Sequence, residues 1–156
     1  VKDMKQKAYI GIDPGKTGAA ALITNEGTHK ILDYPGSSSL IVDTFREWTL
    51  THEIIMAALE KVGARPGQGV VSMFTFGRNL GAWEGIISAF SIPFMMPTPR
   101  QWQKGIIDPK AGTDTKTRSL NTARRLFPDA SLSRKKDHGR ADALLLAFWA
   151  KRQWMN

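Results

Sequence analysis

Three acidic residues of this chain stand where a predicted strand ends or inside an apolar helical segment. Asp13 ends a short β-branched and aromatic run just before a Pro-Gly turn, and Glu60 directly follows another apolar run. Asp142 lies within the segment Ala-Asp-Ala-Leu-Leu-Leu, where a carboxylate without a partner is expensive to bury. The ends of strands are where α/β sheets place their chemistry. If their two strands are parallel neighbours, Asp13 and Glu60 become adjacent.

Two further side chains precede Asp142 closely. His138 lies four residues before it, so the two share one face of a helix, about 6 Å apart along the axis. Asp137 lies five residues before Asp142 and is off that face. Three carboxylates with a histidine or a fourth carboxylate form a hard-oxygen site that suits Mg²⁺ or Mn²⁺. Two such ions, about 3.5–4 Å apart, can activate a water and stabilise the leaving oxygen of a phosphodiester.

Four of these residues also have a ready structural interpretation, and Asp142 is the hardest to explain in that way. Asp13 suits a turn, and Glu60 suits a charged strand end. Asp137 suits the N-cap of the last helix, and His138 suits a surface histidine. The prediction of a metal centre therefore depends on the whole set more than on any single member.

The elements that must position these residues follow from apolar periodicity. Runs of β-branched and aromatic residues between turn signals predict strands over 8–13, 18–24, 30–34, 54–59 and 93–97. Helical spacing of apolar residues predicts helices over 39–50, 79–90, 115–127 and 137–154, with a helical turn over 99–104. A three-strand antiparallel meander followed by crossover helices predicts an α/β fold, with a mixed five-stranded sheet and helices on both faces. We expect a single domain over 1–156.

Positive charge is concentrated in the second half of the chain. There are 22 Lys and Arg residues against 14 Asp and Glu, which gives a formal net charge of +8. The excess is densest between Arg100 and Arg140. A one-sided basic region favours a polyanionic partner, because each neutralised phosphate releases condensed counterions. The alternative is a solvated face that keeps the protein soluble.

Composition excludes several classes of protein. The absence of cysteine excludes a disulfide scaffold, a thiolate metal site and a cysteine nucleophile, and three histidines leave little room for a zinc site. No apolar run reaches the roughly 18 residues of a membrane span, and residues 1–7 contain no apolar signal region. We therefore expect a cytoplasmic protein with no membrane partner.

Three segments resemble motifs of the RuvC family of Holliday junction resolvases, most closely its small phage-type members. They are Tyr-Ile-Gly-Ile-Asp-Pro-Gly at 9–15, Ala-Leu-Glu at 58–60, and Lys-Lys-Asp-His-Gly-Arg-Ala-Asp-Ala-Leu-Leu-Leu-Ala at 135–147. The resemblance covers nearly the whole chain in the right order. It implies a ribonuclease H-like fold, a homodimer, and nicking of two symmetric strands at a four-way DNA junction. It also implies a protein of the bacterial host cytoplasm, encoded by a phage or by the host. It also implies two Mg²⁺ ions per site, for which Mn²⁺ substitutes, and no organic cofactor.

The same resemblance assigns roles to the candidate residues. Asp13 matches the family's first-strand metal ligand, Glu60 the glutamate between the two ions, and Asp142 the aspartate of the last helix. The family's fourth ligand lies three or four residues before that aspartate, where this chain has a glycine and His138. His138 is therefore the expected fourth ligand, and Asp137 is the competing candidate.

Two groups of residues are predicted to contact DNA. The segment 63–77 is expected to be a loop near the junction centre, where Phe74 or Phe76 stacks on an unpaired base, an interaction worth about 1–3 kcal/mol. The alternative is that both rings begin the core of the following helix. Basic residues after the fifth strand and beside the last two helices are expected to contact phosphates. They are Arg100, Lys104, Lys116, Arg118, Lys135 and Lys136.

The predicted helix 79–90 carries an apolar stripe with two interpretations. In the family, the corresponding helix pairs the subunits, whereas an ordinary stripe faces the core. Two functions compete with junction resolution. One is a non-catalytic junction-binding protein that keeps the fold and the basic face, and the other is a ribonuclease H-type nuclease on RNA–DNA hybrids. The stripe consists of Leu80, Trp83, Ile86, Ile87 and Phe90.

Overall fold

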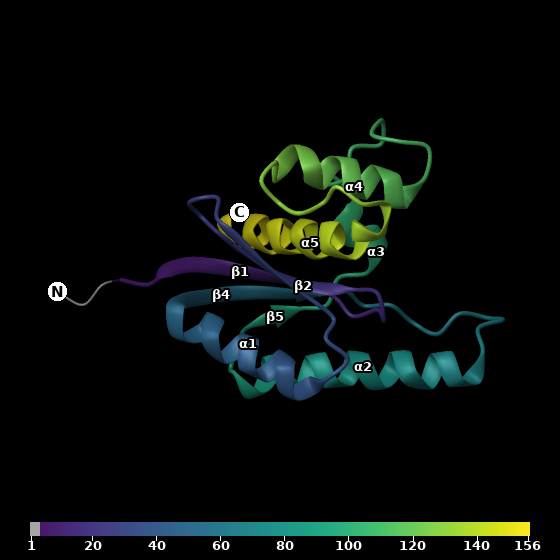
Figure 1. Ribbon diagram of the computed structural model, residues 1–156, viewed down its shortest axis with the longest axis horizontal. Coiled ribbons are helices and arrows are strands. Elements are labelled where there is room, and N and C mark those ends of the chain that lie inside the picture. The colour runs from purple at the N-terminus through teal and green to yellow at the C-terminus, as the bar shows by residue number, and fades with distance from the viewer. Residues whose placement is uncertain (1–3) are drawn as a thin grey trace.

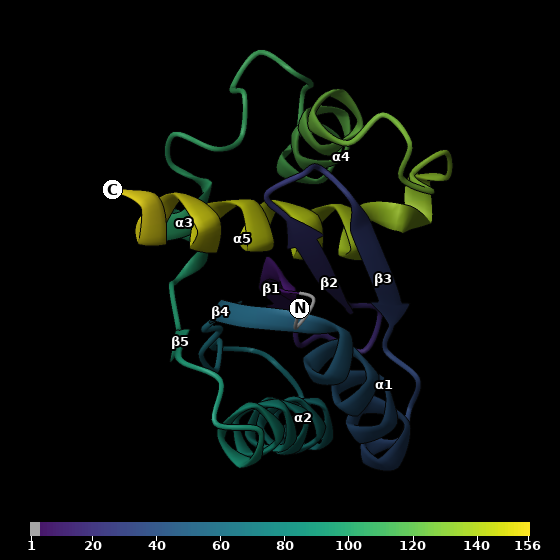
Figure 2. The ribbon, with the colours of Figure 1, turned by 90° about the vertical axis from the view of Figure 1, so that its left-hand side faces the viewer.

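A mixed five-stranded sheet forms the centre of the computed structural model, which describes residues 4–156. The strand order is β3-β2-β1-β4-β5 (Figures 1 and 2). Pairing is antiparallel between β1 and β2 and between β2 and β3, and parallel between β1 and β4 and between β4 and β5. The predicted fold class is confirmed. The strands are β1 (Gln6–Asp13), β2 (Ala19–Thr24), β3 (His29–Asp33), β4 (His52–Leu59) and β5 (Phe94–Met95).

Helices cover both faces of this sheet. Helices α1 and α2 lie on one face, and α4 and α5 lie on the other, with α3 beside α5 (Figures 1 and 2). None of the helices in residues 4–156 is long and apolar enough to cross a membrane. The helices are α1 (Ser38–Thr51), α2 (Val70–Ala89), α3 (Pro99–Gln103), α4 (Thr115–Leu126) and α5 (His138–Met155), with a 3₁₀ turn η1 (Lys135–Asp137) before α5.

The central strand β1 is buried on both faces and divides the core in two. Ile10 and Ile12 belong to the cluster under α1 and α2, and Tyr9 belongs to the cluster under α5. Successive strand residues point to opposite faces. Asp13, two residues beyond Gly11 and four beyond Tyr9, therefore falls on the α5 face of the sheet.

Two glycines let α5 lie unusually close to β1. A Cβ atom at Gly11 would collide with the backbone of Ala143 and Ala147 in α5. A Cβ atom at Gly139 would collide with the backbone of Thr17 in the turn after β1. A glycine inside a strand often marks such a close backbone approach. These contacts fix the start of α5 against the end of β1.

The prediction for the start of α2 was wrong. The helix begins at Val70, not near residue 79, and the loop before it ends at Gly69. Val70, Val71 and Phe74 are more than two-thirds exposed, so the first turns show no core-facing stripe by which a helix is recognised from sequence. Phe74 and the half-buried Phe76 therefore lie on a helix and belong to neither core cluster.

The apolar stripe of α2 faces this chain's own core. Trp83 and Ile87 are fully buried and Ile86 is nearly so, in the cluster they share with α1. Leu80 and Phe90 are partly buried against the same cluster. The core-facing interpretation of the stripe is the one that the structure supports.

Candidate active site

The first two carboxylates are neighbours across parallel strands. The register pairs Ile12 with Leu59, and the Glu60 N–H donates to the Ile12 carbonyl at 3.1 Å. Asp13 and Glu60, the next residues of the two strands, therefore lie beside each other. Glu60 is two residues beyond Ala58, which packs on the α5 face. Alternation therefore directs both carboxylates to the face that α5 covers.

The third carboxylate comes from α5, which begins at the edge where β1 and β4 end (Figure 1). Asp142 lies between Gly139, which packs on the turn after β1, and Ala143, which packs on Gly11. The charge of Asp13 raises the pKa of Asp142, and the charges of both raise the pKa of Glu60. The three carboxylates that the sequence singles out are therefore electrostatic neighbours at this edge of the sheet.

Asp13 combines a turn role with a buried charge. Its side chain accepts a hydrogen bond from the Gly15 N–H at 3.1 Å, as the turn interpretation requires. Burial raises the pKa of Asp13, while the Gly15 N–H and the nearby His138 ring lower it. Asp13 therefore closes the turn and still belongs to the carboxylate group.

Glu60 is only 8% exposed, and burial is the largest cause that raises its pKa to about 8. The charges of Asp13 and Asp142 raise this pKa further. The Trp102 indole and the Arg65 guanidinium oppose the rise. The charged form of a carboxylate in this setting is disfavoured, and a bound cation would stabilise it.

Asp142 has a similar environment with a partner that sequence reasoning missed. Burial, and then the charge of Asp13, raise its pKa to about 7. The Ser119 hydroxyl of α4 donates a hydrogen bond to its carboxylate, and Lys116 also favours the charged form. The only sequence signal for Ser119 is a polar residue next to the inward-facing Leu120 of α4.

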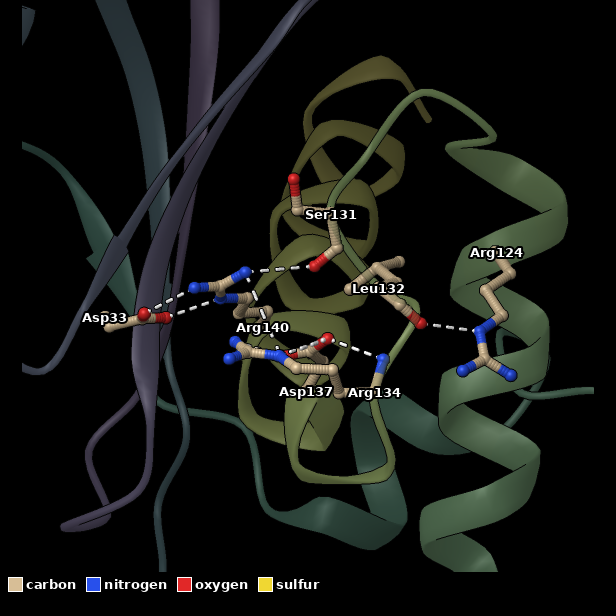
Figure 3. Close-up of polar contacts among 7 residues, drawn as sticks. All are labelled: Asp33, Arg124, Ser131, Leu132, Arg134, Asp137 and Arg140. Atoms are coloured by element: carbon tan, nitrogen blue, oxygen red, sulfur yellow. Dashed lines mark hydrogen bonds and ion pairs between the residues drawn. The ribbon is translucent and has the colours of Figure 1, made fainter.

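Asp137 is held by arginines. It is 2% exposed, and Arg134 donates to it from its guanidinium at 2.7 Å and from its backbone N–H at 2.8 Å (Figure 3). Arg140 adds a weaker ion pair at 3.8 Å. The hydrogen bonds from Arg134 hold the pKa of Asp137 below its usual range. Of the two candidates for the fourth ligand, His138 is the one that contributes to the pKa of Asp13.

Arg140 ties the beginning of α5 to the edge of the sheet. Its guanidinium donates two hydrogen bonds to Asp33 of β3, at 2.6 and 2.7 Å, and one to the Ser131 carbonyl at 3.1 Å (Figure 3). Bidentate pairing of arginine with a carboxylate fixes orientation as well as distance. Because Arg140 lies between His138 and Asp142, this clamp helps to set the position of both.

A cleft of about 580 Å³ opens beside His138 at the start of α4. The helix is capped there by Asp114, whose carboxylate accepts the Thr117 N–H at 3.0 Å. Exposed cations around an opening of this kind suit a phosphate-bearing chain. The residues that line the cleft are Asp114, Lys116, Thr117, Leu120, Lys135, Lys136 and His138.

The other residues predicted to contact phosphates differ in whether their charged groups are free to bind DNA. Arg100 and Lys104 are exposed on and just after α3. Arg118 instead donates to the Gly112 and Thr113 carbonyls, at 2.9 and 3.3 Å, and so holds the loop before α4. These three residues stay predictions as DNA contacts.

In the described part of the chain, no three His, Asp or Glu side chains form a ready-made metal cluster. The donor set nevertheless fits a hard divalent cation, because it offers oxygen ligands and one imidazole. Burial raises the pKa of all three carboxylates, and neighbouring carboxylate charges raise those of Glu60 and Asp142 further, so a bound cation would favour their charged forms. The chemistry of these side chains therefore suits such a cation, although they do not form a preformed cluster.

Comparison with known proteins gives both sequence and structural matches. The chain is 37% identical over 87 residues, 54% of its length, to the chloroplastic Holliday junction resolvase MOC1 of Chlamydomonas reinhardtii. It covers 10% of that protein, so it spans about a tenth of this curated relative's length. No family model matches the chain.

Two solved structures match most of the chain. Thermus thermophilus RuvC in complex with a Holliday junction substrate matches with a TM-score of 0.64 and 14% identity, over 92% of this chain and 91% of that one. A second Thermus thermophilus RuvC structure matches with a TM-score of 0.58 and 18% identity, over 91% and 92% of the two chains. The chain therefore has the fold of RuvC, a ribonuclease H-like α/β fold. Together with the MOC1 match, this confirms the resemblance to RuvC-family Holliday junction resolvases that the three sequence motifs indicate.

Proposed function

We propose that this chain is a metal-dependent, structure-selective endonuclease that resolves four-way DNA junctions by paired symmetric nicks. The observation that carries the proposal is the meeting of Asp13, Glu60 and Asp142 at one edge of a RuvC-like sheet, beside a lysine-lined cleft. The match to a resolvase and to a RuvC bound to a junction supports the choice of substrate.

Asp13, Glu60, Asp142 and His138 would hold the metal, which we propose to be Mg²⁺ with Mn²⁺ as a substitute and two ions per site. When bound, such ions supply the positive charge that activates a water and stabilises the leaving oxygen of the phosphodiester. Asp137 is the weaker candidate for the fourth ligand, because Arg134 already occupies its carboxylate.

The chain's own cations would bind and orient the DNA. Lys116, Lys135 and Lys136 around the cleft would hold backbone phosphates next to the carboxylates, which positions the substrate without reading bases. The first turns of α2 extend from the same edge of the sheet (Figure 1) and expose the Phe74 ring. That ring is available to stack on an unpaired base.

Two nicks at a four-way junction suit a two-fold symmetric protein, because a homodimer offers two equal sites to a nearly two-fold substrate. We therefore propose a homodimer. The apolar stripe of α2 supports this chain's own core, so the subunit contact would use other residues.

The test is cleavage of a synthetic four-way junction with and without Mg²⁺, with both nicks mapped. Symmetric nicks that need Mg²⁺ and disappear in Asp13→Asn, while junction binding persists, are the expected result. A linear duplex and an RNA–DNA hybrid complete the substrate panel. Preferred cleavage of the hybrid would instead indicate a ribonuclease H activity, and tight binding without nicking under any divalent ion would indicate a binding protein.

A further inference from the structure

Two tryptophans are fully buried with an unsatisfied indole N–H. Trp83 in α2 and Trp102 in α3 are both 0% exposed, and neither Nε1 atom has a hydrogen-bond partner among the described residues. A buried donor without a partner costs about 1–3 kcal/mol, so each such group needs a physical explanation.

The surroundings of Trp102 place its indole beside the carboxylate site. The residue after Glu60 is tied to the segment before α3, because the Lys61 N–H donates to the Pro97 carbonyl at 2.8 Å. A capping box formed by Thr98 and Gln101 then begins α3 and fixes its direction. Trp102 belongs to the core cluster on the α5 face together with Ala58, which precedes Glu60 by two residues on that face. In keeping with this placement, the indole lowers the pKa of Glu60, although its N–H falls short of standard hydrogen-bond geometry.

Trp83 lies in the core cluster on the opposite face of the sheet from the carboxylates. Its ring packs against Phe45 and Tyr34, with ring centroids 6.0 and 6.5 Å away. Residues 4–156 thus contain two equally buried indoles with free N–H groups, of which one, Trp102, lies on the α5 face with the carboxylates.

We propose that Trp102 is a positioning residue whose indole N–H donates a hydrogen bond to the Glu60 carboxylate and holds it in its metal-binding orientation. The proposal rests on the proposed metal-dependent function. Hydrogen bonds from outer groups orient ligating carboxylates, and a carboxylate has enough lone pairs to accept such a bond while it binds metal. Bonds of this kind are often long in the free protein and tighten when the site is complete.

The direct test follows the indole N–H resonances of the ¹⁵N-labelled chain by NMR during Mg²⁺ titration. We expect the Trp102 indole proton to move downfield, the Trp83 indole proton to stay in place, and the Trp102 shift to disappear in Glu60→Gln. If backbone amides around Asp13 and Asp142 respond to Mg²⁺ but the Trp102 indole does not, this inference is overturned and the proposed metal site stands. If no resonance responds, the proposed metal site fails and the inference fails with it.

The functional test compares Trp102→Phe with Trp83→Phe. Both remove a buried indole N–H and similar volume, so both lose packing. Because loss of an outer-shell partner typically weakens metal binding or activity by 10–100-fold, we expect the Mg²⁺ concentration for half-maximal cleavage to rise about tenfold in Trp102→Phe only. Metal-free junction binding should be unchanged. An equal change in both variants would assign the effect to packing and overturn the inference.

Discussion

At the scale of single residues, the carboxylates of the site are held in a setting that opposes their ionisation. Burial and mutual repulsion raise the pKa of Glu60 to about 8 and that of Asp142 to about 7. Such strain is common at functional sites, where stability is sacrificed for chemistry. Because these charges oppose folding, removing one of them should change the free energy of unfolding of the metal-free protein.

Glu60→Gln and Asp142→Asn should each stabilise the metal-free protein while abolishing cleavage. Each variant keeps the side-chain shape and removes one of the mutually repelling charges. We expect the free energy of unfolding at about pH 8 to rise by roughly 1–2 kcal/mol, measured by urea denaturation. Glu26→Gln, at an exposed turn, is the control and should change it by less than about 0.5 kcal/mol. Destabilisation by both site variants would show that the carboxylates do not repel one another.

The stability of the metal-free protein should also fall as pH rises from about 5 to 8. Because the pKa values of Glu60 and Asp142 are raised on folding, the native state binds more protons than the unfolded state in this window. The lowered pKa values of Asp33 and Asp137 affect stability only at more acidic pH.

The measurement is the urea midpoint as a function of pH, with Glu60→Gln expected to flatten the slope. Added Mg²⁺ should restore stability at the alkaline end, because a ligand that binds only the native state stabilises it. A midpoint that rises with pH over this window would contradict the raised pKa values.

At the scale of elements, the site depends on how closely α5 approaches β1. Gly11 and Gly139 remove the side chains that would keep the two apart, and Arg140 clamps the start of α5 to Asp33 of β3. Side chains along β1 and β4 alternate between the two faces of the sheet, and this places Asp13 and Glu60 on the face that α5 covers. The helix and the two strands therefore meet with their acidic residues at one edge.

Gly11→Ala should displace α5 and cost about 1–3 kcal/mol of stability, because the new methyl group meets backbone atoms that have no room to move. Gly81→Ala is the control, since Gly81 lies in α2 with open space around it. There the substitution should be neutral or stabilising by up to about 1 kcal/mol. Thermal or urea unfolding measures both, and equal effects in the two variants would argue against the close approach.

At the scale of the whole molecule, a net charge of +8 is distributed so that exposed lysines surround the site. Lys116→Ala combined with Lys135→Ala should weaken junction binding and lower the slope of log K against log salt by about 2. Lys5→Ala with Lys7→Ala removes the same charge at the far end of β1 and serves as the control. An equal loss of slope in both double variants would mean that net charge, not the cleft, binds the DNA.

Local patterns in the chain were enough to predict the five strands, most helices and the three carboxylates. A strand repeats every two residues and a helix every 3.6, so apolar spacing and turn residues show where each element lies and which residue ends it. The family motifs, which are short and contiguous, could be recognised in the same way.

Contacts between residues distant in the chain were decided only by the tertiary structure. The start of α2 at Val70 cannot be recognised from the sequence, because its first turns carry no core-facing stripe. The hydrogen bonds from Arg134 to Asp137 depend on the geometry of the 3₁₀ turn η1. The Ser119 hydroxyl bonds Asp142, and Trp102 lies on the same face as Glu60, because α3 and α4 pack beside α5. No local sequence pattern predicts these contacts, because they depend on how whole helices and strands pack against one another in space.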